Sequence, residues 1–175
     1  MSNILILYST TDGHTIEICK RIASVLTAGG ARVETQDLKD VPVLREGDFD
    51  KIVIGASIRY GKHQPRVAAF IKQNQALLEA HPNAFFTVNV VARKPEKNTP
   101  ETNPYLIKFL RTIDWRPQLL GVFAGKINYP IYRFWDRQMI RLIMWMTKGP
   151  TDPTTVIEFT DWDKVEAFGR KIASL

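Results

Sequence analysis

The stretch Ser9-Thr10-Thr11-Asp12-Gly13-His14-Thr15 decides the fold that we expect for this chain of 175 residues. An apolar run, 4–8, precedes it, and an amphipathic run, 16–26, follows it. A run that is apolar throughout is typical of a strand buried on both faces of a parallel sheet. The amphipathic run is typical of a helix with one buried face. The sequence therefore predicts a strand, a short hydroxyl-rich turn and a helix in direct succession.

The turn between this strand and this helix has the composition of a phosphate site. The first turn of a helix carries backbone N–H groups without partners, together with partial positive charge. Serine and threonine add hydroxyl donors, and Gly13 permits a positive φ. These groups together favour a phosphate. A simpler interpretation also fits, in which Thr10, Asp12 or Thr15 caps the helix and Asp12-Gly13 forms an ordinary turn.

The motifs that the turn lacks narrow the kind of phosphate. It has no Gly-Lys-Ser/Thr, which a nucleoside-triphosphate loop requires, and no G-x-G-x-x-G, which marks a dinucleotide site. A cradle of hydroxyls and amides without lysine suits the monophosphate of a bound cofactor better than a triphosphate that is cleaved.

Composition gives the broad class of the protein. The length suggests a single domain over 1–175, and the net charge of +6 suggests an anionic substrate, nucleic acid or an anionic membrane as partner. Cys19 has no cysteine to pair with, which fits a reducing compartment. We expect no signal peptide, and no apolar run approaches the ~18–20 residues of a spanning helix. His14, His63 and His81 are too scattered to predict a metal site.

Strand and helix patterns alternate along the rest of the chain. We expect further strands at 31–37, 51–57, 84–91 and 119–124, and helices at 13–28, 64–80, 102–112 and 162–173. Thr160 or Asp161 is the expected cap of the last helix. This alternation predicts an α/β fold with a doubly wound parallel sheet. Residues 126–155 interrupt the alternation as a helical insertion before the last helix.

Ligands of such sheets bind beyond the carboxyl ends of the strands. Three loops follow such ends in this chain, and together they form the candidate cofactor site. The first loop contains the Ser9–Thr15 turn. The other two loops have amide, hydroxyl and cationic groups that suit the edges of a flat ring. The candidate cofactor-binding residues are Ser9, Thr10, Thr11, Asp12, Gly13, His14, Thr15, Ser57, Ile58, Arg59, Tyr60, Gly61, Asn89, Val90, Val91, Ala92 and Arg93.

In these loops and in the order of its elements, the chain resembles the flavodoxin family along nearly its whole length. The resemblance implies a five-stranded sheet of order 2-1-3-4-5 and FMN as cofactor. It also implies that the FMN phosphate lies in the first loop and that the isoalloxazine ring lies between the loops after the third and fourth strands. Because the ring becomes anionic on reduction, Arg59 or Arg93 is a candidate to stabilise that charge.

Runs 53–61 and 88–97, the insertion, and Thr160-Asp161-Trp162 together resemble the menaquinone-dependent protoporphyrinogen dehydrogenases of bacteria. That resemblance implies an oxidoreductase of haem biosynthesis in which FMN takes electrons from protoporphyrinogen IX. Menaquinone or ubiquinone would then accept them. It also implies a peripheral protein on the cytoplasmic face of the inner membrane, with an anionic lipid surface and no nucleic acid as partner. A homo-oligomer is an open possibility.

The insertion contains a basic amphipathic helix over 133–148. Arg133, Arg137, Arg141 and Lys148 share one sector of it, and the apolar residues on the other side are Trp135, Met139, Leu142, Ile143, Trp145 and Met146. A helix of this kind with tryptophan on its apolar face is typical of a membrane interface. A subunit interface and extra core are the alternatives. Arg133, Arg137 and Arg141 are candidates to dock the propionates of the substrate, and a solvated polar face is the simpler interpretation.

Single features of the sequence argue against other functions that occur with the same fold. A soluble flavodoxin that only carries electrons is typically acidic, whereas this chain is basic. An FMN-dependent NAD(P)H:quinone reductase remains an alternative, although no feature here serves a nicotinamide. A phospho-receiver domain is excluded, because the residues after the first and third strands are Ser9-Thr10 and Ala56-Ser57 where that domain needs aspartates.

Overall fold

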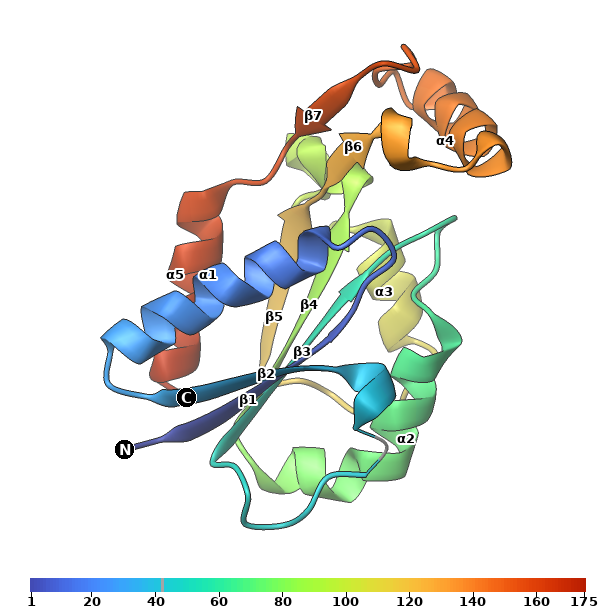
Figure 1. Ribbon diagram of the computed structural model, residues 1–175. Helices are drawn as coiled ribbons and strands as arrows, with labels where there is room; N and C mark the ends of the chain where they lie inside the picture. Colours follow the sequence, from blue (N-terminus) through green and yellow to red (C-terminus); the bar gives the residue numbers. More distant parts are fainter. Residues whose placement is uncertain (42) are drawn as a thin grey trace.

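The computed structural model describes residues 1–41 and 43–175. Its centre is a five-stranded parallel sheet of order β2-β1-β3-β4-β5, which confirms the predicted α/β fold and strand order (Figure 1). The strands are β1 (Asn3–Ser9), β2 (Arg32–Asp37), β3 (Lys51–Ser57), β4 (Asn83–Asn89) and β5 (Leu119–Ala124). Ser9 pairs with Ala56 and Ser57 pairs with Val88, so β1, β3 and β4 end at the same edge of the sheet.

Helices cover both faces of this sheet (Figure 1). On one face lie α1 (His14–Ala28) and α5 (Trp162–Ala173), and on the other lie α2 (Pro65–Ala80) and α3 (Pro104–Leu110). Strand β1 shows why both faces are apolar, since successive side chains point to opposite sides. Ile4 and Ile6 pack with α1 and α5, while Leu5 and Leu7 pack with α2 and α3.

The ends of several elements differ from the predicted ones for local reasons. Gly13 precedes α1 with φ +90°, and none of its neighbours caps that helix with a side chain. Asp161, and not Thr160, caps α5, because its carboxylate accepts from Lys164 N at 3.2 Å. β4 ends at Asn89, whose side chain accepts from Ala92 N and starts a short 3₁₀ turn, η2 (Val90–Arg93). The other 3₁₀ turns are η1 (Leu38–Asp40), η3 (Pro95–Lys97) and η4 (Tyr129–Ile131).

The insertion is built on a two-stranded ribbon that the sequence patterns did not reveal. Strands β6 (Lys126–Asn128) and β7 (Val156–Glu158) pair antiparallel and carry α4 (Phe134–Met146) beyond the carboxyl edge of the main sheet (Figure 1). A small buried cluster holds the unit together, and it consists of Ile127, Tyr129, Tyr132 and Met144. Three-residue strands are too short to show alternation.

Close packing between β3 and β4 makes Gly55 a sensitive position. A methyl group there would lie 2.1 Å from Phe86 Cζ, which is fully buried. Gly55→Ala therefore forces Phe86 to move, and we expect it to lower the free energy of unfolding by about 1–3 kcal/mol in urea titrations. Gly125→Ala is the control, since its methyl would meet Val88 Cγ1 at 3.5 Å. Equal losses in the two variants would contradict the packing argument.

Candidate functional site

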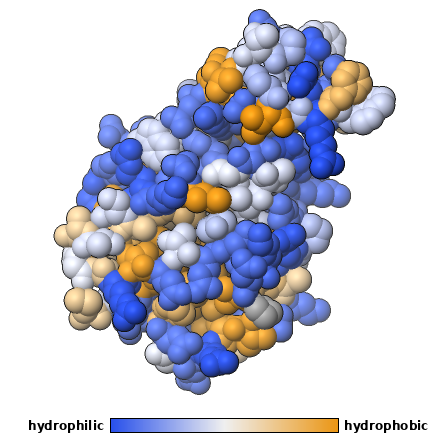
Figure 2. Space-filling model, in the orientation of Figure 1, coloured by the Kyte–Doolittle hydropathy of each residue, from blue (hydrophilic) through white to orange (hydrophobic). Residues whose placement is uncertain are grey.

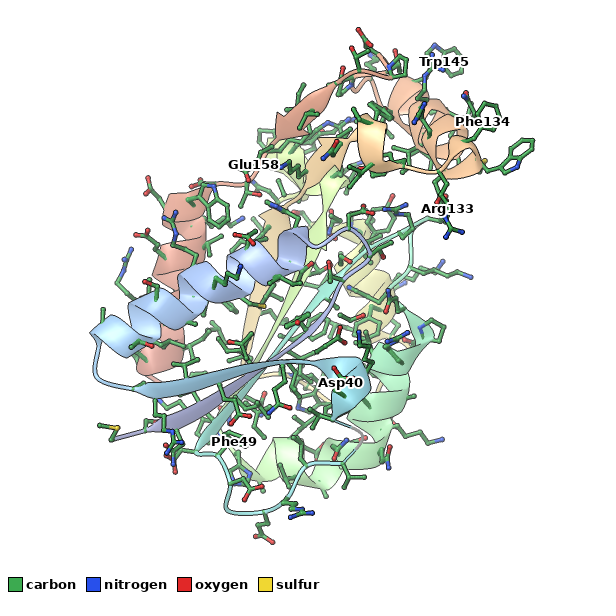
Figure 3. All side chains as sticks on the ribbon, in the orientation of Figure 1. Asp40, Phe49, Arg133, Phe134, Trp145 and Glu158 are labelled. Carbon is green, nitrogen blue, oxygen red and sulfur yellow. The ribbon has the colours of Figure 1, made fainter. Side chains whose placement is uncertain are left out.

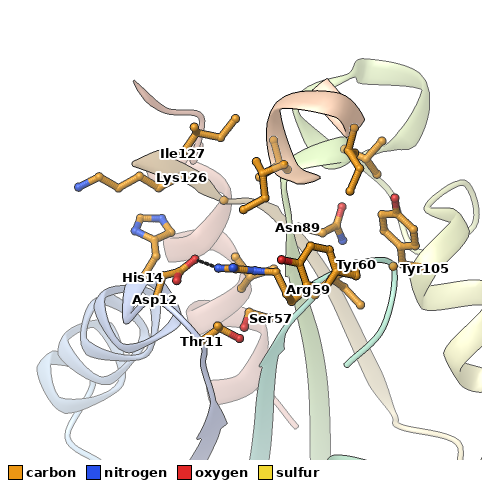
Figure 4. Close-up of a pocket in the computed structure, with 18 of the residues that line it drawn as sticks. Thr11, Asp12, His14, Ser57, Arg59, Tyr60, Asn89, Tyr105, Lys126 and Ile127 are labelled. Atoms are coloured by element: carbon orange, nitrogen blue, oxygen red, sulfur yellow. Dashed lines mark hydrogen bonds and ion pairs between the residues drawn. The ribbon is translucent and has the colours of Figure 1, made fainter. Parts of the chain in front are cut away.

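One pocket gathers most of the predicted cofactor residues at the carboxyl ends of β1, β3 and β4 (Figure 4). It contains about 910 Å³ of space, part of it open to solvent, and the insertion forms its roof. The predicted residues that line it are Thr10, Thr11, Asp12, His14, Thr15, Ser57, Ile58, Arg59, Tyr60, Gly61, Asn89, Val90, Val91 and Arg93.

Ser9, Gly13 and Ala92 do not line the pocket, and each shapes a loop beside it. Ser9 Oγ donates to Gln64 Oε1 at 2.8 Å, while Gln64 Nε2 donates to the Thr10 carbonyl at 3.2 Å. The amide of Gly13 donates to Thr10 Oγ1 at 2.9 Å, and that of Ala92 donates to Asn89 Oδ1 at 3.1 Å. These bonds hold the loops in the shapes that face the pocket.

The first loop offers unused donors at the start of α1. The amides of Thr11, Asp12, His14 and Thr15 donate to no atom of the part of the chain that the structure describes. The hydroxyl of Thr15 is buried there and also lacks a partner. Buried polar groups are normally hydrogen-bonded. This convergence of unpaired donors at a helix N-terminus fits a phosphate group.

An ion pair joins the first loop to the loop after β3. The Arg59 guanidinium, only 18 % exposed, bonds to the Asp12 carboxylate and lies 5.2 Å from the centre of the Tyr132 ring (Figure 4). Burial alone would lower the pKa of Arg59, but the Asp12 carboxylate raises it above its ordinary value. The pair therefore holds the Arg59 guanidinium in a fixed position inside the pocket and neutralises the one acid of the first loop.

The other end of the pocket combines polar groups with apolar side chains of α4. Ser57 Oγ is buried without a hydrogen-bond partner, and the Asn89 side chain lies nearby. Tyr60 and Tyr105 stand at the same end (Figure 4). From above, α4 supplies Ile140 and Ile143. Polar groups at the edges with apolar groups above suit a flat heteroaromatic ring.

His14 turns toward the ribbon of the insertion. Its Nε2 lies 2.6 Å from Thr160 Oγ1, and that hydroxyl donates to the Ala124 carbonyl at 2.7 Å. Its Nδ1 lies 3.8 Å from the Glu158 carboxylate. Burial lowers the pKa of His14, although Glu158 raises it in part. His14 thus joins the first loop to the end of the insertion, and contact with a phosphate stays a prediction.

Several lining residues were missed by the sequence patterns. They are Val88, Tyr105, Gly125, Lys126, Ile127, Tyr132, Ile140, Met144 and Thr147, and also Ile143, which was assigned to the apolar side of the helix but not to the cofactor site. Most of them belong to the insertion. One signal could have located them. Because β5 lies beside β4 and parallel to it, the residues that follow β5 must leave the sheet at the edge where the pocket lies.

The three predicted substrate-docking arginines lie outside the pocket lining. Arg137 donates to the Tyr132 carbonyl at 3.3 Å, and Arg141 donates to the Thr151 carbonyl at 2.7 Å. Arg133 precedes α4 and is exposed (Figure 3). The cationic residues that line the pocket are Arg59, Arg93 and Lys126. Docking by the three arginines stays a prediction.

The outward face of α4 is apolar and exposed. Trp135 is 77 % exposed, Trp145 71 % and Phe134 62 %. Figure 3 shows Phe134 and Trp145 pointing away from the rest of the molecule, and Figure 2 shows hydrophobic residues on the surface of this projecting end. These side chains are therefore not extra core, which was one of the alternatives for this face.

Comparison with known proteins agrees with this geometry. A family model described as a flavodoxin domain matches residues 5–154. Protoporphyrinogen IX dehydrogenase (quinone) of Escherichia coli (strain K12) is 45% identical over 171 residues, which are 98% of this chain and 94% of that protein. The enzyme of the same name from Leishmania major is 46% identical over 172 residues, which are 98% of this chain and 74% of that protein. The chain belongs to this flavodoxin-domain family.

Solved flavodoxins share the fold of this family member at low identity. Oxidised flavodoxin 1 from Bacillus cereus aligns with a TM-score of 0.57 and 17% identity over 99% of this chain and 98% of that one. Two-electron reduced flavodoxin from Megasphaera elsdenii aligns with a TM-score of 0.59 and 14% identity, over 98% and 99%. At such identities the likeness concerns the fold alone.

A buried histidine beneath the site predicts a pH dependence of stability. Burial lowers the pKa of His63 from 6.5 to about 4, and its Nε2 lies 3.0 Å from Thr87 Oγ1. Between these pH values the unfolded chain binds a proton that the folded chain does not. The free energy of unfolding should therefore fall by about 1.4 kcal/mol per unit as the pH drops from 6.5 toward 4.

Urea titrations at pH 7 and pH 5 measure this effect. His63→Gln keeps an amide donor for Thr87 but cannot titrate, so the variant should lose the part of the slope that His63 contributes. His14 contributes in the same direction and remains in both proteins. An unchanged slope in His63→Gln would show that His63 is not the responsible group.

Proposed function

We propose that this protein is an FMN-dependent oxidoreductase that oxidises protoporphyrinogen IX to protoporphyrin IX, with menaquinone or ubiquinone as electron acceptor. The observation that carries the proposal is the pocket itself, in which unpaired donors at the start of α1 share one space with apolar side chains of α4. The identity to protoporphyrinogen IX dehydrogenases (quinone) supports the substrate and the acceptor. The reaction belongs to haem biosynthesis.

Residues of the pocket divide the work of binding FMN. The amides of the first loop and the Thr15 hydroxyl would hold the phosphate, and the loops 57–61 and 89–93 would flank the ring. FMN, when bound, supplies the acceptor for the electrons of the substrate. Arg59 or Arg93 would stabilise the negative charge that the ring then gains. Both are already engaged, Arg59 with the Asp12 carboxylate and Arg93 with the uncharged carbonyls of Val90 and Thr147, so both stay candidates.

The roof of the pocket offers an apolar surface to the substrate. Ile140, Ile143 and Met144 face inward from α4, and a tetrapyrrole is a large apolar ring. Arg133, Arg137 and Arg141 stay our candidates for its propionates. Arg133 is the most accessible of the three, because Arg137 and Arg141 bond to backbone carbonyls.

Anaerobic mixing tests the activity directly. FMN-loaded protein mixed with protoporphyrinogen IX should lose the absorbance of oxidised flavin, and added menaquinone should restore it. NADPH should leave the absorbance unchanged, which separates the proposal from an NAD(P)H:quinone reductase. Flavin that stays oxidised with protoporphyrinogen IX would contradict the proposed activity and favour a flavodoxin that only carries electrons.

We also propose that the outward face of α4 lies in an anionic membrane surface, where quinones are found. Its support is the exposed set Trp135, Met139, Leu142, Trp145 and Met146, flanked by basic residues. Among residues 1–41 and 43–175, no helix is long and apolar enough to cross a membrane. A helix lying in the interface needs no span. Each basic residue near anionic lipid adds ~1 kcal/mol.

Vesicle flotation measures this contact. The double variant Trp135→Ser/Trp145→Ser should bind vesicles of phosphatidylglycerol and phosphatidylcholine about tenfold more weakly than the native protein, because two large apolar side chains no longer enter the lipid. Val43→Ser removes an exposed apolar residue elsewhere and should have no effect. Equal flotation of the native protein and the double variant would contradict contact of this face with lipid and would favour a subunit interface.

A further inference from the structure

The turn 59–62 lies beside the end of the pocket where we place the flavin ring. Its conformation needs stabilising contacts from outside the turn. Tyr60 has φ +52° and Gly61 has φ +76°. Arg59 N donates to Lys62 O at 2.9 Å, and Lys62 N donates to Arg59 O at 3.2 Å, so the turn is closed by two hydrogen bonds. Two positive φ angles in such a turn favour Asn and Gly, and a tyrosine there is uncommon. Contacts beyond the turn must therefore favour this shape.

The insertion supplies those contacts. The Tyr60 hydroxyl donates to the carboxylate of Asp136 in the first turn of α4. The neighbouring Arg59 lies over the Tyr132 ring, which also belongs to the insertion. The side chains of Tyr60 and Arg59 thus both contact a segment more than 70 residues away in the sequence, and Arg59 also bonds to Asp12 of the first loop. Asp136 itself does not line the pocket.

The C-terminal end of α4 is bonded to the loop after β4, the second loop that would flank the ring. Arg93 of η2 donates from Nη2 to the Thr147 carbonyl at 2.9 Å and lies 3.3 Å from Thr147 Oγ1. That carbonyl belongs to the C-terminal end of the helix, where a cation is favoured. α4 is therefore joined at its first turn to the loop after β3 and at its last turn to the loop after β4.

We infer that Asp136 is a positioning residue of the flavin site, which holds Tyr60 and the turn 59–62 in the shape that binds the ring. This inference rests on the proposed function. A turn held from outside before the cofactor arrives loses less freedom on binding, so the hydrogen bond should strengthen FMN binding without touching FMN. It also couples the membrane-facing helix to the cofactor, and such coupling acts in both directions.

Three variants of α4 separate the hydrogen bond from other effects. Asp136→Ala removes the acceptor for Tyr60, whereas Asp136→Asn removes the same charge but keeps an acceptor oxygen. Gln138→Ala removes a polar side chain of the same helix that contacts Arg141 and not the ring loops. The measurements are the FMN dissociation constant, from quenching of flavin fluorescence, and amide exchange of 59–62 in the FMN-free protein.

We expect Asp136→Ala to raise both the dissociation constant and the exchange rates by about threefold to tenfold, as for loss of one partly exposed hydrogen bond. Asp136→Asn should stay within about twofold of the native protein, and Gln138→Ala should be unchanged. The inference is overturned if Asp136→Ala changes neither quantity. It is also overturned if Asp136→Asn is as impaired as Asp136→Ala, because the charge at the helix start would then be responsible.

Tyr60→Phe removes the same bond from its other end and keeps α4 intact, so it serves if Asp136→Ala does not fold. Combined with Asp136→Ala, it should add little to the effect of either change alone, and additive effects would contradict the inference. Amide exchange needs neither FMN nor substrate. A native protein that binds no FMN would therefore defeat the proposed function, while the exchange data would still decide whether Asp136 holds the turn.

Discussion

The unpaired amide groups at the start of α1 are the constraint on which the site depends. These donors can remain without protein partners beside a pocket only if neighbouring elements hold the loop in a fixed shape. Buried β1, with Ile4 to Leu7 at 0–1% exposure, supplies that support, and Gln64 braces the loop through Ser9 and Thr10. Gly13, at φ +90°, lets the chain turn into the helix without a side chain that would cover the donors. The flavodoxin-type sheet then brings the loops after β3 and β4 to the same edge.

The insertion gives this common fold its particular character. One helix, α4, has an inward side that roofs the pocket and an outward side that is apolar and exposed. Its ends are held by Tyr60 and Arg93, which come from the loops after β3 and β4. If the outward side lies in a membrane, as we propose, a hydrophobic electron acceptor dissolved in lipid would meet the pocket close to its roof. The insertion is thus the part of the chain to which our proposal assigns access for a quinone, while the sheet and its loops have the common flavodoxin fold.

Local patterns in the sequence predicted what depends on local structure. Apolar runs located four strands of the sheet, an alternating pattern located β2, and the composition of 9–15 located the donors of α1. The patterns could not place Lys126, Tyr132 or Thr147 at the pocket, because their positions follow from how the insertion folds back over the sheet. They put Ile143 on the apolar side of the helix but did not assign it to the pocket, because a single apolar face was assumed and α4 has apolar residues on two sides. The ribbon of β6 and β7 was missed because each strand has three residues.

Comparison of FMN with riboflavin tests the central claim most directly, since the two ligands differ only in the phosphate. Titrating the flavin-free protein with each ligand under the same conditions isolates the contribution of the α1 donors. Several charge-assisted hydrogen bonds to the phosphate should make FMN bind about a hundredfold or more tighter than riboflavin. Thr15→Val, which removes a buried hydroxyl without a partner in the protein, should reduce that ratio. Equal affinity for FMN and riboflavin would contradict the claim that the start of α1 is a phosphate site.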